Sequence, residues 1–343
     1  MSGQTAIVVA IVLIWAVSGG VHDTGTLTAT GIASRALTPR HAIVIVGVFG
    51  FVGPLVAGTA VATTIGSFVD LSDLPPSSAL WTVAAGLAAA IVWNVVTWRA
   101  GIPASSTHGL VGGLVGATIV AGGFGDVQWG FAALADGNVE GVAKVVLALL
   151  ISPLIGLAVG AAVQAVVAWS LRSAGPVWNR RLRLAQLPTV AALSFAHGMN
   201  EAQKSMGVMA LALLVGGTTD RLEVPFWVVL ICAATIPIGA VVGGWRIVRT
   251  LGYGIYRLRP IHAAGAQFTS AAVVGATSVW GGPVSTSQVT SSAVIGVGAA
   301  ENARAVRWET GKAILVAWLL TMPCTALLAA LIVAILKAAG AIA

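Results

Sequence analysis

The sequence predicts an all-α polytopic membrane protein, built from two inverted-topology repeats with broken helices and helical hairpins and about 10–12 transmembrane segments. Of its 343 residues, 57% are hydrophobic and only 8% are charged, whereas soluble domains contain roughly 25% charged residues. The apolar residues form repeated runs near the roughly 20-residue length that crosses a bilayer. A third observation is that one pattern of acidic and hydroxyl residues occurs twice along the chain.

About ten apolar runs are the predicted spans. They cover residues 4–21, 41–69, 79–99, 103–124, 142–170, 187–215, 225–245, 262–280, 283–299 and 311–337. The runs 103–124 and 283–299 begin with proline and hydroxyl residues and are rich in glycine. Irregular backbone survives in a membrane only where protein or water surrounds it, so we expect helical hairpins or re-entrant segments in these two places.

Arg221 lies in an acidic loop of the opposite set. The other thirteen arginine residues fall in alternate loops and set the expected orientation. They are Arg35, Arg40, Arg99, Arg172, Arg180, Arg181, Arg183, Arg246, Arg249, Arg257, Arg259, Arg304 and Arg307. Because the loops rich in lysine and arginine are cytoplasmic, segment 172–186 is the expected cytoplasmic linker. The expected location of the protein is the cell (inner) membrane. The linker separates a first repeat, 1–171, from a second, 187–343, and both termini are expected outside.

The repeated pattern places an acid ahead of a hydroxyl-rich loop. Asp23 precedes Pro103 by 80 residues, and Glu201 precedes Pro283 by 82 residues. Each half contains about five predicted spans, and an odd number makes the second half enter the membrane from the opposite side. This is the plan of secondary transporters, whose substrate sites lie near the midplane on interrupted helices.

Asp23 and Glu201 are the acids that lie within apolar spans; the other nine of the eleven lie in loops or flank them. Glycine and threonine residues around Asp23, in the stretch from Ser18 to Arg35, predict a broken helix there. An acid inside a membrane marks a functional site by default. It can coordinate a small cation, with hydroxyls such as that of Thr26 completing the shell, or it can take up a proton. The alternative is an acid that only caps a broken helix.

The hydroxyl loops are the candidate anion site. Their hydroxyl residues are Ser105, Ser106 and Thr107 in the first loop and Ser285, Thr286 and Ser287 in the second. Free N–H groups, hydroxyls and the positive dipole end of a helix bind anions, so two such helix starts that face each other could hold a tetrahedral oxyanion. The alternative is that these residues are ordinary N-caps and interhelical hydrogen bonds.

Four further residues flank the motifs. Lys204 follows Glu201 by three residues; it either attracts the anion as a fixed cation or only neutralises Glu201 or Asp23. His22, His108 and His197 each lie beside a motif, where metal contact or proton relay competes with a structural role. The sequence does not identify a metal and indicates no cofactor.

At these residues the chain resembles the inorganic phosphate transporter (PiT) family, and its bacterial branch in particular. "VHDTGT" (Val21–Thr26) and "MNEAQK" (Met199–Lys204) resemble the duplicated signature G-A-N-D-x-x-N of that family. "PASSTH" (Pro103–His108) and "PVSTSQ" (Pro283–Gln288) resemble its paired P-x-S-[ST]-T-H loops. The resemblance covers nearly the whole chain, with four motifs in the family's order.

The resemblance implies an inverted-repeat helical symporter, often a homodimer, that moves inorganic phosphate with Na⁺ or H⁺. By motif position, Asp23, Asn200 and Glu201 take the cation-side roles, and the hydroxyl loops hold the oxyanion. The chain departs from the family where Thr26 and Lys204 replace asparagine. Two lost amide ligands and a nearby ammonium weaken a Na⁺ site, so the departures favour H⁺ as the coupling ion.

Other functions remain open at this stage. A permease for sulfate or another tetrahedral oxyanion is the main alternative, and the substrate could also be a metal–phosphate complex. A passive channel fits the pair of buried acids less well. An intramembrane enzyme is a further alternative, but the sequence lacks the usual motifs of such enzymes, such as HExxH or a nucleophile elbow. We therefore expect no enzymatic activity. Membrane lipid is expected to surround the protein. The net charge is +7, but the basic residues lie mostly in loops, so this charge does not indicate a nucleic-acid partner.

Overall fold

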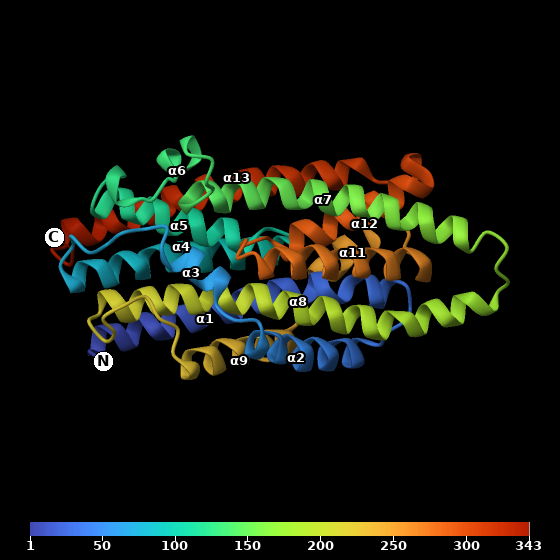
Figure 1. Cartoon of the computed structure of the whole chain (residues 1–343), viewed down its shortest axis with the longest axis horizontal. Coiled ribbons are helices and arrows are strands. Elements are labelled where there is room, and N and C mark those ends of the chain that lie inside the picture. Colours follow the sequence, from blue (N-terminus) through green and yellow to red (C-terminus); the bar gives the residue numbers. More distant parts are fainter. Residues whose placement is uncertain (343) are drawn as a thin grey trace.

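The computed structural model describes residues 1–342 as a bundle of helices, most of which run along one axis (Figure 1). The helices are α1 (Gly3–Ala33), α2 (Pro39–Val56), α3 (Ala60–Gly66), α4 (Pro76–Ala100), α5 (Ser106–Ala121), α6 (Phe131–Ala135), α7 (Gly141–Ser170), α8 (Val177–Val215), α9 (Phe226–Val242), α10 (Trp245–Tyr253), α11 (Pro260–Val279), α12 (Thr286–Asn302) and α13 (Trp308–Ala338). Two short 3₁₀ turns, Phe124–Asp126 and Ala303–Ala305, and an isolated antiparallel bridge between Val69 and Val127 add to them. The predicted all-α class is confirmed.

Several helices have the length and composition of membrane spans. Within residues 1–342, α1, α2, α4, α7 and α13 could each cross a membrane, and α9 with α10 forms a sixth candidate that is bent by 77°. Leucine side chains on the outer faces of these helices are exposed, among them Leu154 at 67% and Leu327 at 72%, as a lipid-facing surface requires. The chain is therefore a multi-pass membrane protein, and the count of about ten crossings stays a prediction.

The predicted runs break where glycine allows the chain to turn. The run 41–69 is divided into α2 and α3 beside Gly58, whose φ is +70°. The run 225–245 ends its first helix at Gly243, with a φ of +73°, and continues past its expected end as α10. The run 103–124 becomes helical only at Ser106, after a segment that follows Gly101 with a φ of +69°. Residues with a Cβ rarely adopt such angles.

The helix break expected near Asp23 is wrong, because α1 continues without interruption through this residue. Thr24 and Thr28 donate their hydroxyls to carbonyls four residues earlier, at 2.6 and 2.7 Å, and so are satisfied within their own helix. A Cβ added to Gly25 would collide with the backbone at the start of α10. Glycine here permits close helix packing and does not end the helix. α8 likewise continues through Glu201.

The two halves have the same order of elements. In the first half the order is α1, α2–α3, α4, α5 and α7, and in the second it is α8, α9–α10, α11, α12 and α13. Contacts correspond too: α5 packs against α4 and α13, and α12 against α11 and α7; α1 packs against α9 and α10, and α8 against α2 and α3. In Figure 1, α1 leads away from the end that holds the N-terminus and α8 returns toward it.

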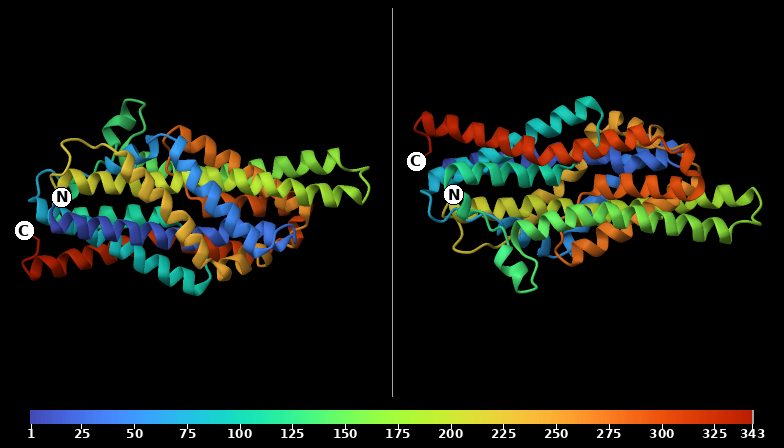
Figure 2. Two further views of the ribbon diagram at one scale, coloured as in Figure 1. Left: turned by 90° about the horizontal axis from the view of Figure 1, so that it is seen from below. Right: turned by 90° about the horizontal axis from the view of Figure 1, so that it is seen from above.

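Both termini lie at one end of the bundle, and the connection between α7 and α8 lies at the other (Figures 1 and 2). There α7 and α8 project beyond the remaining helices in both views of Figure 2. The connection is shorter than the expected linker 172–186, because α8 begins at Val177 and takes Arg180, Arg181 and Arg183 into its first turns. An odd number of crossings in each half requires this opposite placement.

The largest buried apolar cluster joins the two halves. It includes Trp15 of α1, Leu87 of α4, Leu110 of α5 and Met206 of α8, each at most 2% exposed. Buried polar side chains, among them Asp23 of α1 and Lys204 of α8, lie on the same helices. The packed core thus fixes the helices that bring the polar motifs together.

Candidate functional site

The hydroxyl-bearing starts of α5 and α12 meet in the middle of the bundle (Figure 1). Thr107 donates from Oγ1 to the carbonyl of Val284 at 3.4 Å, and Ser287 donates from Oγ to the carbonyl of Ala104 at 2.7 Å. Each helix is therefore bonded to the loop that leads into the other. Two helix N-termini, each with unpaired N–H groups and a positive dipole end, converge at this point.

Ser105 and Ser285 are N-caps. Ser105 Oγ accepts the N–H of His108 at 3.1 Å, and Ser285 Oγ accepts the N–H of Gln288 at 3.4 Å. Ser285 Oγ also lies 3.0 Å from Ser287 Oγ. The capping role that the sequence left open is thus observed for these two serines, and both caps order the helix starts.

Ser106 lies between the two acids. Its Oγ is 3.4 Å from Asp23 Oδ2 on α1 and 3.4 Å from Glu201 Oε2 on α8. Asp23 is 1% exposed, and the side chain of Glu201 is 12% exposed. Because a hydroxyl has one proton, Ser106 can donate to one carboxylate at a time, and since the hydroxyl is neutral both carboxylates still need a cation or a proton to balance their charge.

Lys204 neutralises Glu201 and joins it to both loops. Its Nζ donates to Glu201 Oε1 at 2.5 Å, to Thr107 Oγ1 at 2.6 Å and to the carbonyl of Val284 at 2.7 Å. The side chain is fully buried, and these bonds use all three donors of the ammonium group. Asp23 is left as the acid without an ammonium partner.

His197 completes a cluster of possible cation ligands. Ligand atoms of Asp23, His197 and Glu201 all lie within 4.8 Å of one another. His197 Nδ1 is 3.1 Å from Thr286 Oγ1, so the second hydroxyl loop also reaches this cluster. A cavity of about 10 Å³ beside His197 and Glu201 has room for about one water molecule. Two carboxylates and an imidazole can hold a small cation or exchange protons.

His22 and Asn200 hold the hydroxyl loops. Each directly precedes an acid in its helix. His22 Nε2 is 3.3 Å from the N–H of Ala104, and its Nδ1 is 3.7 Å from Asp23 Oδ1. Asn200 Nδ2 donates to the carbonyl of Gly282 at 3.3 Å, and its Oδ1 is buried with no hydrogen-bond partner among residues 1–342. The two side chains thus connect each acid-bearing helix to the loop of its own half.

Thr26 and His108 are not joined to the cluster by any hydrogen bond within residues 1–342. Thr26 lies one turn past Asp23, and its buried Oγ1 has no partner in that part of the chain. His108 and Gln288 instead line a mostly apolar cavity of about 920 Å³ between α7 and α13.

Two threonine residues outside the predicted motifs also bind the loops. Thr64 of α3 donates to the carbonyl of Gly281 at 3.0 Å, and Thr250 of α10 donates to the carbonyl of Gly101 at 2.6 Å. Both glycines have a positive φ, +70° and +69°, and open the loops. The signal in the sequence is the position of these glycines, each two residues before the loop proline.

The chain is similar to known proteins along nearly its whole length. The family model described as "Phosphate transporter family" matches residues 19–182 and 171–329. A "Probable low-affinity inorganic phosphate transporter" from Bacillus subtilis (strain 168) is 36% identical over 329 residues, which cover 95% of each chain. A protein of the same name from Rhizobium meliloti (strain 1021) is 37% identical over 94% of this chain and 93% of its own. A solved structure described as "The sodium-dependent phosphate transporter" has a TM-score of 0.80 and 26% identity, covering 98% of this chain and 100% of that one.

Proposed function

The chain belongs to the phosphate transporter family, and from that premise we propose that it is a symporter that takes up inorganic phosphate together with protons. The observation that carries the proposal is the position of Ser106, between Asp23 and Glu201 and at the meeting point of two helix N-termini. A place for an oxyanion thus adjoins the acids that can handle the driving ion.

Phosphate is bound by the starts of α5 and α12. To bind the anion, the hydroxyls of Ser106, Thr107, Thr286 and Ser287 exchange the protein partners that they have in the structure for phosphate oxygens. The helix starts add N–H groups, and the two dipoles supply partial positive charge. Lys204 adds a fixed charge next to Thr107. In a site closed to water, a donor without a partner costs about 1–3 kcal/mol, so an anion that satisfies many donors is favoured.

Coupling follows from the charges around Asp23. Lys204 compensates Glu201, so an arriving anion meets one carboxylate, Asp23, that has no ammonium partner. Two adjacent negative charges in a medium of low dielectric constant repel strongly. A proton on Asp23 removes this repulsion, and phosphate and proton are then taken up together.

The chain's departures from the family favour H⁺ over Na⁺. The related solved structure is described as sodium-dependent. Here Thr26 stands where the family has an amide, and its Oγ1 makes no hydrogen bond within residues 1–342. At the equivalent position in the second half, Lys204 places an ammonium group against Glu201, and this ammonium repels Na⁺. His197, beside both acids, has ring nitrogens that can accept or donate a proton.

We further propose that residues 1–171 and 187–343 are inverted repeats in the cell (inner) membrane, with both termini outside. The matching order of helices, their corresponding contacts and the opposite directions of α1 and α8 support this (Figure 1). Alternating access then consists of one repeat moving against the other around the central loops.

The test is uptake of radiolabelled phosphate by the purified protein in proteoliposomes. We expect accumulation above equilibrium when the outside is acidic, no dependence on a Na⁺ gradient, and little competition from excess sulfate. Accumulation that is driven by a Na⁺ gradient and does not change with pH would contradict H⁺ as the coupling ion. Equal uptake of sulfate would make the protein a general oxyanion permease.

A further inference from the structure

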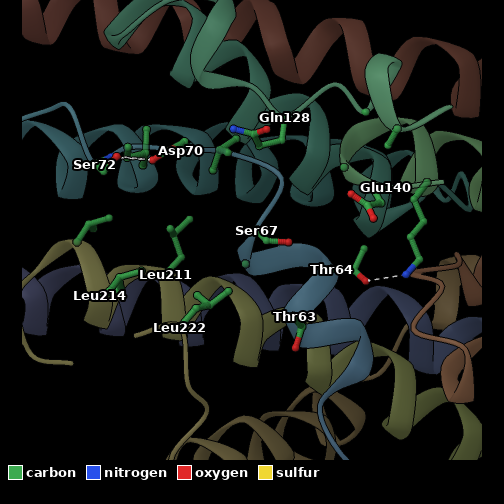
Figure 3. Close-up of a pocket in the computed structure, with 18 of the residues that line it drawn as sticks. Thr63, Thr64, Ser67, Asp70, Ser72, Gln128, Glu140, Leu211, Leu214 and Leu222 are labelled. Carbon is green, nitrogen blue, oxygen red and sulfur yellow. Dashed lines mark hydrogen bonds between the residues drawn. The ribbon is translucent and has the colours of Figure 1, made fainter. Parts of the chain in front are cut away.

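A large cavity opens at the end of the molecule where the two termini lie (Figures 1 and 3). Its volume is about 1240 Å³, and its walls come from α3, the start of α7, the end of α8 and the segments between them. Asp70, Ser72 and Glu140 on its wall are exposed, so water reaches it. We refer to this cavity as the vestibule.

Lys144 is a cation within the vestibule that has no acidic partner. Its Nζ donates to Thr64 Oγ1 at 3.3 Å, the bond drawn as the dashed line beside Thr64 in Figure 3. None of the ion pairs formed within residues 1–342 includes Lys144. Its side chain is half-buried, whereas Asp70 and Glu140 are exposed and better screened by solvent. Two of the three ammonium donors remain free for a ligand.

Asp70 is engaged within its own loop. The hydroxyl and the N–H of Ser72 donate to Asp70 Oδ1 at 2.7 and 3.0 Å, and these two bonds hold the pKa of that carboxyl below its usual value. Asp70 therefore stays ionised and bonded to Ser72 and does not occupy Lys144.

The vestibule floor leads to the central site. Thr64, which accepts from Lys144, donates in turn to the carbonyl of Gly281, where the second hydroxyl loop begins. Three residues further along the chain, the carbonyl of Val284 accepts a hydrogen bond from Lys204 Nζ. α3 is fixed in this place because the N–H of Val61 donates to Gln203 Oε1 on α8 at 2.8 Å. One short helix thus separates Lys144 from the loop that ends at the phosphate site.

We propose that Lys144, held in place by Thr64, forms with the hydroxyl of Ser67 an outer oxyanion site at which phosphate first contacts the protein. Ser67 and Thr64 lie on the same side of the vestibule, below Glu140 in Figure 3. A half-buried ammonium attracts an anion over a distance set by ionic strength, and hydroxyl groups orient it. The identity of the anion rests on the proposed function, but the position of the site does not.

The experiment measures phosphate uptake by the full chain in proteoliposomes at low and high ionic strength. Lys144→Gln is expected to raise the KM for phosphate roughly three- to tenfold at low ionic strength with little change in maximal rate. The wild-type KM should rise with salt toward that of the variant. Lys144→Arg keeps the charge and should restore a KM near that of the wild type. Lys312→Gln, an exposed lysine of α13 that pairs with Glu309, is the matched control and should leave KM unchanged.

The outcomes separate this site from the transport function. If the wild type moves phosphate and Lys144→Gln has the same KM and the same salt dependence, the outer site is absent. If Lys144→Gln lowers the maximal rate alone, Lys144 is only a tether for α3, which also overturns the proposal. A wild type that moves no phosphate contradicts the proposed function itself; in that case, protection of Lys144 from amine modification by inorganic phosphate still tests the site.

Discussion

Ser106 lies 3.4 Å from both carboxylates, at the loop where phosphate is proposed to bind. Ser106→Ala and Thr286→Ala each remove a donor from a site closed to water. A lost bond to a charged partner costs about 1.5–3 kcal/mol, so the apparent affinity for phosphate should fall roughly ten- to a hundredfold. Uptake at varied phosphate concentration measures this. Ser170→Ala, at an exposed serine bonded within α7, is the control; wild-type affinity in both site variants would show that these hydroxyls do not bind phosphate.

Asp23 is the acid that must change its charge if protons drive transport. Asp23→Asn keeps the shape of the side chain and removes the charge change. Accumulation driven by an imposed pH gradient should be lost, while exchange of phosphate at equal concentrations on both sides should survive. Both are measured in the same proteoliposomes, with Asp73→Asn in an exposed loop as control. Undiminished gradient-driven accumulation by Asp23→Asn would contradict proton coupling at this residue.

Part of this site could be predicted because the repeat places similar residues at nearly equal spacing, 80 and 82 residues. Asp23, Glu201 and Ser106 were grouped in this way, and they do lie together. The spacing could not predict that Lys204 would bond to both loops at once, since this requires the two halves to be packed. Nor could it show that the Thr26 hydroxyl would be left without a partner within residues 1–342: three residues past Asp23 it shares the helix face, and its bonding depends on the neighbouring helices.

At the level of elements, α3 and α10 each hold the loop of the opposite half through one threonine. Thr250→Val leaves the carbonyl of Gly101 without its 2.6 Å bond. A buried carbonyl without a partner costs about 1–3 kcal/mol, so the variant should unfold at a lower temperature in detergent. Thr63→Val is a matched control, because Thr63 is exposed and donates only within its own helix. Equal unfolding temperatures for the two variants would show that Thr250 does not stabilise the loop.

The end of α12 is held by ionic contacts that depend on pH. Glu301, beyond the apolar run of α12, accepts from Arg259 and His262 of α11 and from Gln164 of α7. Burial opposes its ionisation, but the hydrogen bonds and charges of His262 and Arg259 outweigh burial and lower the pKa of Glu301. Its stabilising effect is therefore present above the unfolded pKa of about 4.3 and is lost as the pH falls through the folded value.

Glu301→Gln should consequently lower the unfolding temperature at neutral pH, and the difference from wild type should shrink as the pH falls below about 4.5. Thermal unfolding in detergent across this range measures it. Glu309→Gln, an exposed acid paired with Lys312, is the control and should have little effect at any pH. A difference that persists unchanged in acid would mean that Glu301 acts through its shape and not its charge.

The positions of helices could be predicted where the length and hydropathy of an apolar run determine them. Helix breaks at glycine residues were harder to predict. The apolar runs correspond to helices, and the hydroxyl loops do begin shorter helices. Glycine near Asp23 predicts a break, yet Gly25 provides the close approach of α1 to α10. A glycine that permits packing and a glycine that ends a helix look alike in one sequence, because the difference lies in the neighbouring helix.

On the scale of the whole molecule, the two halves are hydrogen-bonded to each other at the hydroxyl loops. Ser287 of the second half donates to Ala104 of the first, and Thr107 of the first donates to Val284 of the second. A movement of one repeat against the other therefore has to break or exchange these bonds at the loops where phosphate is proposed to bind. Substrate and movement are connected by the same hydroxyls.

The orientation in the membrane is the last prediction, and it rests on the ends of the bundle. Both termini lie at the end of the bundle nearer the vestibule, and the arginine-rich start of α8 lies at the opposite end (Figures 1 and 2). Arginine is retained on the cytoplasmic side, so the vestibule should face outward, where phosphate arrives. Ser2→Cys and Leu182→Cys, each made without Cys232 and Cys324, place one thiol at either end. In intact cells a membrane-impermeant maleimide should label the cysteine at position 2 and reach position 182 only after the membrane is opened. Labelling of both cysteines from outside would place the termini and the arginine residues on the same side of the membrane. That result would contradict both the inverted repeats and the outward-facing vestibule.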